Sequence, residues 1–111
     1  MVSNMNRGDI YWVNLEPTQG AEIRKKRPGV IVGATPINRA RHTVVVVPLS
    51  TEAKPRPPIA IPVDCLGRQA VAVCDQIRAV DKTRLLKLEG CLSLKDIDAL
   101  DEGLKQVLSL D

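Results

Sequence analysis

Short β-branched runs separated by loops dominate the sequence between Gly8 and Leu92. The clearest run is Thr43–Leu49 (TVVVVPL), and loops rich in proline, glycine or charge flank it. Runs of this length and composition are typical of β-strands. We predict strands over Gly8–Leu15, Pro28–Ala34, Thr43–Leu49, Ile59–Val63, Gln69–Cys74 and Leu85–Leu92. The segment Asp75–Arg78 either continues the fifth strand or ends it, and Thr35–Arg41 is predicted to be a loop.

A different periodicity begins at Ser93. Apolar residues recur at helical spacing, and Ser93 forms a capping-box-like pair with Asp96. The apolar positions are Leu94, Ile97, Leu100, Leu104, Val107 and Leu108. Short strands closed by one amphipathic helix indicate a small, strongly bent sheet or barrel. Residues 1–111 are predicted to form a single domain. Because Pro48 has no N–H to donate, we expect the end of its strand at a sheet edge or a bulge.

Composition excludes several classes of protein and site. The longest apolar run, Val44–Leu49, is far shorter than the roughly 20 residues that span a bilayer. With no apolar segment before Arg7, we expect a cytoplasmic protein that does not contact a membrane. Three cysteines without a CxxC pair argue against disulfides and zinc, and Cys74 is expected in the core. A single histidine, His42, excludes a multi-histidine metal site. We therefore predict neither metal nor cofactor.

Positive charge is concentrated in one segment, Arg24–Arg27, and we call the loop that contains it the cation-rich loop. Arg24, Lys25, Lys26 and Arg27 follow one another directly before Pro28, and their mutual repulsion is offset if a polyanion binds there. The alternative is a solvated loop. Residues 1–85 carry 13 basic and 7 acidic side chains, a net charge of +6, whereas residues 86–111 carry 3 and 6, a net charge of −3. A basic body with an acidic tail fits a polyanionic partner for the body.

Arginine, hydroxyl and isolated acidic side chains suit phosphodiester chemistry. A guanidinium binds two phosphate oxygens and keeps its charge at physiological pH. Cleavage of RNA requires no enzyme nucleophile, because the substrate's own 2′-hydroxyl can attack the adjacent phosphorus. The protein must then orient that attack and stabilise the charge that develops on the phosphorane.

Four ordered motifs resemble the MazF/PemK (Kid-like) toxins of bacterial toxin–antitoxin systems. The opening segment RGDIYWVNLEPTQGAEIRKKRPGVIV (7–32) resembles the family's opening signature. The segments VVVVPLST (44–51) and VCDQIRAVDKTRL (73–85) resemble its central strand and its late acidic segment, and a terminal amphipathic helix follows. The resemblance covers essentially the whole chain.

This resemblance implies a mainly β fold with a C-terminal α-helix, the SH3-like barrel of the CcdB/MazF plasmid maintenance toxins. It implies a homodimer that cleaves single-stranded mRNA at a short sequence without a metal. The products would carry a 2′,3′-cyclic phosphate and a 5′-hydroxyl. A MazE-like antitoxin would neutralise the toxin by laying an acidic segment across its basic groove.

The resemblance also implies site residues. Arg27 matches the catalytic arginine, Ser50 the catalytic Ser/Thr, Glu22 the acid of the first loop and Asp75 the late acid. Residues expected to bind RNA are Arg24, Lys25, Lys26, Thr51, Gln76 and Arg78. Some members carry an arginine two residues before the late acid, where this chain has Val73. That departure places more weight on Arg27.

Each assignment has a structural alternative. Ser50 could only cap a turn, Asp75 could pair with Arg78, and Glu22 could pair with a neighbouring cation. Which of Arg27, Glu22 and Asp75 is acid or base stays open. Two other functions remain as alternatives: a CcdB-like toxin that inhibits a protein such as gyrase, and a non-catalytic RNA-binding barrel.

Overall fold

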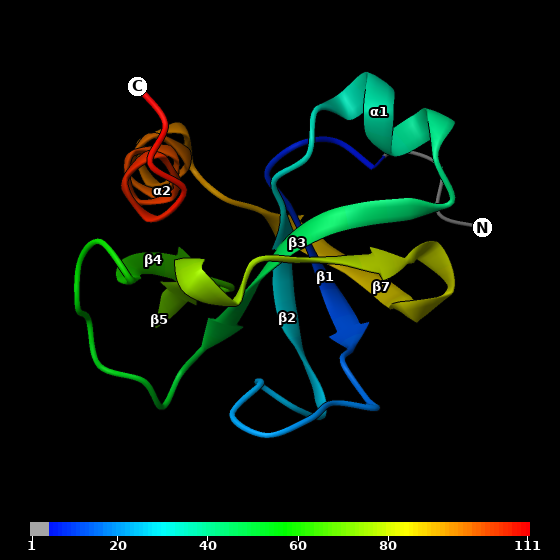
Figure 1. Ribbon diagram of the computed structural model, residues 1–111, viewed down its shortest axis with the longest axis horizontal. Coiled ribbons are helices and arrows are strands. Elements are labelled where there is room, and N and C mark those ends of the chain that lie inside the picture. The colour runs from blue at the N-terminus through cyan, green and yellow to red at the C-terminus, as the bar shows by residue number, and fades with distance from the viewer. Residues whose placement is uncertain (1–4) are drawn as a thin grey trace.

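Seven strands form one curled antiparallel sheet in the computed structural model, which describes residues 5–111 (Figure 1). The strands are β1 Asp9–Asn14, β2 Lys26–Ile31, β3 Thr43–Ser50, β4 Ala60–Cys65, β5 Arg68–Val73, β6 Arg78–Asp81 and β7 Leu85–Cys91. The helices are α1 Thr35–Ala40 and α2 Leu94–Val107, with 3₁₀ turns η1 Cys74–Gln76 and η2 Lys82–Arg84. The predicted mainly β fold with a C-terminal helix is confirmed.

The central strand β3 has three partners. The strand order is β4-β5-β3-β2-β1-β7, and β6 pairs with the first half of β3. On that same edge, β6 pairs with β3 as far as Val46, and β5 begins to pair at Leu49. Pro48 lies between these two ladders. The prediction was a sheet edge or a bulge, and the proline lies within the sheet, where one partner strand replaces another.

The sheet buries a separate apolar cluster on each face. One cluster joins Ile10, Val30 and Val47 to residues of β4, β5 and α2, including Leu100. The other surrounds the fully buried Tyr11 and includes residues of β1, β2, β3, β6 and β7. Residues 5–111 include no helix long and apolar enough to cross a membrane.

The prediction of a loop over Thr35–Arg41 was wrong, because α1 occupies most of it. Pro36 lies in the first turn, where its missing N–H costs no hydrogen bond. The buried Asn38 amide donates to the carbonyls of Met5 and Gly33, at 3.0 and 2.8 Å. A helix of six residues is too short for periodicity to reveal, and tertiary hydrogen bonds hold it in place.

The predicted cap of α2 is half right. Ser93 Oγ accepts a hydrogen bond from the Asp96 backbone N–H at 3.1 Å. The Asp96 carboxylate accepts instead from the Asp64 N–H, at 2.8 Å, and so ties the first turn of α2 to β4.

Candidate active site

The predicted site residues gather where β1 and β3 end and β2 begins. The loop between β1 and β2 and the loop between β3 and β4 leave the sheet at this same end, the lower one in Figure 1. Arg24, Lys25 and Lys26 are exposed, whereas Arg27 is half-buried. Three of the four cations thus face solvent, and the fourth is held by the fold.

Arg27 is fixed by strand pairing and by one side-chain hydrogen bond. It lies in β2 opposite Val13 of β1. Its Nε donates to the carbonyl of Arg24 at 3.1 Å. The terminal nitrogens of the guanidinium carry further N–H groups, which point away from Nε in a planar fork and suit a bidentate phosphate contact.

The β2–β3 register relates Arg27 to Ser50. Gly29 pairs with Pro48, Val30 with Val47 and Ile31 with Val46. Continuing this antiparallel register by two residues puts Arg27 across from Ser50. Residues directly opposite one another in a sheet share a face, and alternate residues of a strand do so too. Arg27 and Ser50 therefore belong to the face that buries Tyr11.

Ser50 is 8% exposed and its hydroxyl caps the start of the β3–β4 loop. The hydroxyl oxygen accepts from the backbone N–H groups of Glu52 and Ala53, at 3.2 and 3.1 Å. This is the turn-capping role considered as the alternative. A hydroxyl oxygen that accepts hydrogen bonds still has its own hydrogen to donate, so capping leaves a phosphate contact open.

Gln76 and Arg78 hold the cation-rich loop at one residue, Ile23. The Ile23 N–H donates to Gln76 Oε1 at 3.3 Å, and the Ile23 carbonyl accepts from Arg78 Nη2 at 2.7 Å. The Ile23 side chain packs against the apolar cluster around Tyr11. The segment Gln76–Arg78 thus binds both backbone groups of Ile23. The next residue, Arg24, supplies the carbonyl that orients Arg27.

Hydrogen bonds that the sequence did not predict join the two ends of the same loop. Leu15 N–H donates to the Lys25 carbonyl at 3.0 Å, and Lys25 N–H donates to Glu16 Oε1 at 2.9 Å. Arg84 donates to the carbonyls of Asn14 and Glu16. Lys25 has a φ of +69°, a conformation rare for a residue with a side chain. Local backbone strain of this kind is common near functional sites.

The two candidate acids lie in exposed positions. Glu22 Oε1 accepts from the Gln19 N–H at 2.6 Å and stabilises a turn within the β1–β2 loop. Asp75 lies in η1, directly before Gln76 and therefore beside the segment that binds Ile23. No group of three or more metal-ligating side chains occurs within residues 5–111.

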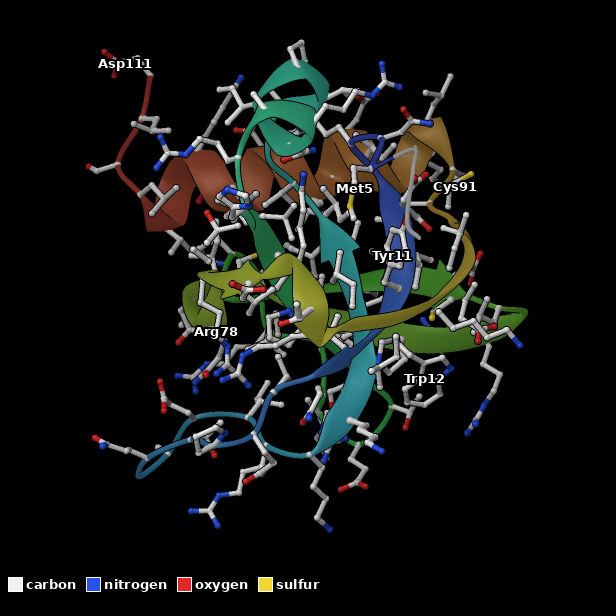
Figure 2. The ribbon with its side chains drawn as sticks, turned by 90° about the vertical axis from the view of Figure 1, so that its right-hand side faces the viewer. Met5, Tyr11, Trp12, Arg78, Cys91 and Asp111 are labelled. Atoms are coloured by element: carbon white, nitrogen blue, oxygen red, sulfur yellow. The ribbon has the colours of Figure 1, made fainter. Side chains whose placement is uncertain are left out.

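The opposite face of the same sheet end contains a pocket. Ten residues line it: Trp12, Lys26, Arg27, Pro28, Leu49, Thr51, Cys65, Leu66, Arg68 and Ala70. Figure 2 shows Trp12 and Arg78 on opposite sides of β2. Lys26, Arg27 and Thr51 were predicted site residues. Trp12 and Arg68 were not, although a lone tryptophan in a strand beside a cationic loop was a signal to consider them.

Comparisons with known proteins agree on one family. The family model described as PemK-like, MazF-like toxin of type II toxin–antitoxin system matches residues 6–108. Endoribonuclease MazF9 of Mycobacterium tuberculosis is 35% identical over 96% of this chain and 98% of its own length. Endoribonuclease EndoA of Bacillus subtilis is 30% identical over 96% of each chain.

Solved structures share the fold. MazF from Deinococcus radiodurans has a TM-score of 0.85 at 20% identity, covering 95% of this chain and 96% of its own. A mycobacterial endoribonuclease in complex with its cognate antitoxin has a TM-score of 0.79 at 22% identity, covering 96% of each chain. The sheet, the helix α2 and the matched motifs thus place this chain in the PemK-like, MazF-like family of type II toxins.

Proposed function

We propose that the protein is the toxin of a type II toxin–antitoxin system and a metal-independent endoribonuclease that cleaves single-stranded mRNA at a specific sequence. The observation that carries this proposal is the β2–β3 register, whose last observed pair is Gly29 with Pro48. Extended by two residues beyond that pair, the same register brings Arg27 opposite Ser50. Two relatives that cover almost the whole chain are named endoribonucleases.

The proposed reaction is an internal transesterification. The substrate's 2′-hydroxyl oxygen bonds to the adjacent phosphorus as the bond from phosphorus to the 5′-oxygen breaks. The 2′-hydroxyl loses a proton and the leaving 5′-oxygen gains one, which gives a 2′,3′-cyclic phosphate and a 5′-hydroxyl. Arg27 binds the non-bridging oxygens and stabilises the charge of the phosphorane. Ser50 donates its hydroxyl hydrogen to the same phosphate.

Glu22 and Asp75 are, with Arg27, the proposed candidates for proton transfer. Each of the two acids carries an exposed carboxylate at the border of the cation-rich loop. Proton transfer needs a group within hydrogen-bond reach of the reacting oxygen once substrate is bound. A pH–rate profile of Glu22→Gln and Asp75→Asn assigns the roles, because loss of the base removes the acidic limb and loss of the acid removes the basic limb.

Incubation with a long single-stranded RNA in EDTA tests the function. We expect discrete fragments whose 5′ ends accept phosphate from a polynucleotide kinase without prior phosphatase treatment. RNA that binds and stays intact would support the non-catalytic barrel. RNA that is neither bound nor cut would favour the alternative function, a CcdB-like toxin that inhibits a protein.

Arg27→Ala tests the site. We expect cleavage to fall at least about 100-fold, the usual cost of removing one donor to a developing oxyanion, with the circular dichroism spectrum unchanged. Arg41→Ala is the matched control, because Arg41 is equally an arginine but lies beyond α1, away from the cation-rich loop. Equal rates for the two variants would show that Arg27 is not catalytic.

The assembly and location follow from the same proposal. We propose a homodimer in the cytoplasm, held inactive by a MazE-like antitoxin whose acidic segment covers Arg24, Lys25 and Lys26. One solved relative is described as being in complex with its cognate antitoxin. A small acidic protein encoded directly upstream of this gene is the expected antitoxin, and its co-expression should suppress RNA cleavage and give a stable complex on size exclusion.

A further inference from the structure

A small pocket lies on the sheet face opposite Ser50, between the start of β2 and the turn that joins β4 to β5. Its volume is about 180 Å³, well below the 300–1,000 Å³ of pockets for drug-sized ligands. Trp12 forms one wall beside Pro28, its partner in the β1–β2 ladder. Leu49, Leu66 and Ala70 complete an apolar lining.

The pocket is also lined by positively charged side chains. Lys26, Arg27 and Arg68 line the pocket, and none of its ten residues is acidic. An apolar cavity with an aromatic wall and only positive charges fits a flat, unsaturated ring attached to an anion. A nucleotide has this chemistry, because its base has a π-face and its phosphate carries the charge.

Arg27 connects the pocket to the proposed cleavage site. Strand alternation assigns Arg27 to the face of Ser50, yet Arg27 also lines the pocket on the other face. A strand whose phosphate is bound by Arg27 therefore has a neighbouring base within reach of Trp12. We propose that this pocket binds one nucleobase of the RNA, stacked on Trp12, with Arg68 on its phosphate and the Thr51 hydroxyl available to the base edge. This inference rests on the proposed function.

The chain offers a direct probe of the pocket, because Trp12 is its only tryptophan. Intrinsic fluorescence would be titrated with four 2′-deoxy homo-oligonucleotides, one for each base, which lack the attacking hydroxyl. An abasic oligonucleotide of the same length carries the same charge without bases. We expect saturable quenching by at least one base-bearing strand and none by the abasic strand. Quenching only by an acidic peptide with leucine side chains would instead make this a protein-binding pocket and overturn the proposal.

Variants separate stacking from strand stability. Trp12→Leu should weaken oligonucleotide binding by about tenfold, measured by anisotropy, whereas Trp12→Phe, which keeps an aromatic face, should bind within about threefold of wild type. Arg68→Ala should weaken binding about tenfold, and the control Arg41→Ala should leave it unchanged. Circular dichroism confirms that each variant folds. Equal affinities for the leucine and phenylalanine variants would contradict stacking.

The two proposals fail in different ways. If the protein cleaves RNA but its tryptophan fluorescence does not change with any base-bearing strand, there is no base pocket at Trp12. The nuclease proposal then stands. A protein that does not cleave RNA under any of the conditions above is not the proposed nuclease, and the pocket then has no RNA substrate to position.

Discussion

Asp9 carries an almost wholly buried carboxylate at the start of β1, with 8% of the residue exposed. Its Oδ2 accepts a hydrogen bond from the Asn6 N–H at 3.0 Å. Burial raises the pKa of Asp9 above its ordinary value, and the hydrogen bond from Asn6 opposes that shift only in part. Burial, and after it the nearby charge of Asp9, also raises the pKa of Tyr11. The ionised Asp9 is therefore a destabilising feature of the folded state at neutral pH.

Asp9→Asn should stabilise the protein at pH 7, because asparagine keeps an oxygen for the Asn6 N–H and removes the buried charge. The folded-state pKa lies above the unfolded one, so the cost of the charge is present at neutral pH. It disappears as pH falls through the folded-state pKa and the carboxyl takes up a proton. The melting temperature of the variant should thus exceed that of wild type at pH 7, with a smaller margin at pH 4. A margin independent of pH would contradict this account.

Residue roles could be predicted only in part from the sequence. Arg27 was predicted as a candidate catalytic residue because a motif and a following proline marked it, and that role stays a prediction. The partners of Gln76 and Arg78 were not, because Ile23 lies 53 and 55 positions away and nothing in either segment specifies that contact. Arg84 and Trp12 were missed for the same reason, since their significance depends on which loop or strand the fold brings beside them.

At the scale of elements, the β1–β2 loop depends on a side chain outside it. Gln76→Leu keeps the size of the side chain but leaves the Ile23 N–H without its acceptor, at a cost of about 1–3 kcal/mol if the group stays buried. Gln76→Glu keeps an acceptor. If Gln76 positions the loop, the glutamate variant should cleave RNA within about threefold of wild type, and the leucine variant should lose at least tenfold in kcat.

The same pair of variants tests the alternative in which Gln76 contacts RNA directly. A new carboxylate beside the RNA backbone would repel it, so the glutamate variant would then be the weaker one, with the loss appearing in KM. Steady-state kinetics on a fluorogenic RNA oligonucleotide shows which of the two variants, Gln76→Glu or Gln76→Leu, is the less active, and whether the loss lies in kcat or in KM.

Helix α2 packs on β4 through a glycine, Gly103. A Cβ added there would lie 2.9 Å from Ile61 Cγ1, 3.1 Å from the Pro58 carbonyl oxygen and 3.2 Å from Cys74 Sγ. Alanine favours a helix over glycine by up to about 1 kcal/mol, whereas overpacking costs about 1–3 kcal/mol. The backbone oxygen cannot easily move, so overpacking should prevail. Gly103→Ala should lower the free energy of unfolding by roughly 1–2 kcal/mol, measured by urea denaturation.

Asp98→Ala is the control for that experiment, because Asp98 lies on the exposed face of the same helix. It gains helix propensity without a clash, so its stability should equal or exceed that of wild type. A stabilised Gly103→Ala variant would show that β4 and α2 separate more readily than their packing suggests.

Elements with strong periodicity were predictable, and those fixed by tertiary contacts were not. The valine-rich β3 and the amphipathic α2 were both recognised, because burial of one face or of both leaves a pattern in the sequence. The helix α1 was missed because its side-chain hydrogen bonds run to Met5 and Gly33, outside its own segment. Pro48 predicted an edge or a bulge and not a change of partner strand, because such a change inside a sheet has no local signature.

At the scale of the whole molecule, strand order lies beyond what periodicity can predict. Alternation indicates a strand and its buried face, but β1 pairs with β7 across more than 70 residues, for example Ile10 with Gly90. The β1–β2 and β3–β4 loops share one end of the sheet because β1, β2 and β3 are consecutive antiparallel neighbours. The cation-rich loop is informative in sequence because of its charge. It becomes a candidate site because this strand order places the end of β3 beside it and because Gln76 and Arg78 bind it at Ile23.

The uneven charge of the chain gives a final prediction. Arg24 and Lys25 are exposed on the cation-rich loop, and Lys95 and Lys105 are exposed on α2. Changing either pair to glutamine removes two positive charges, so both variants have the same net charge. If Arg24 and Lys25 contact phosphates, their loss should flatten the slope of log K against log salt by about 1.4, since each contact with a single strand contributes about 0.7. The α2 pair should leave the slope unchanged. Binding of an uncleavable 2′-deoxy oligonucleotide, measured by anisotropy across salt concentrations, distinguishes the two variants. Equal slopes for both would mean that net charge alone attracts RNA and that the loop has no defined contact with the strand.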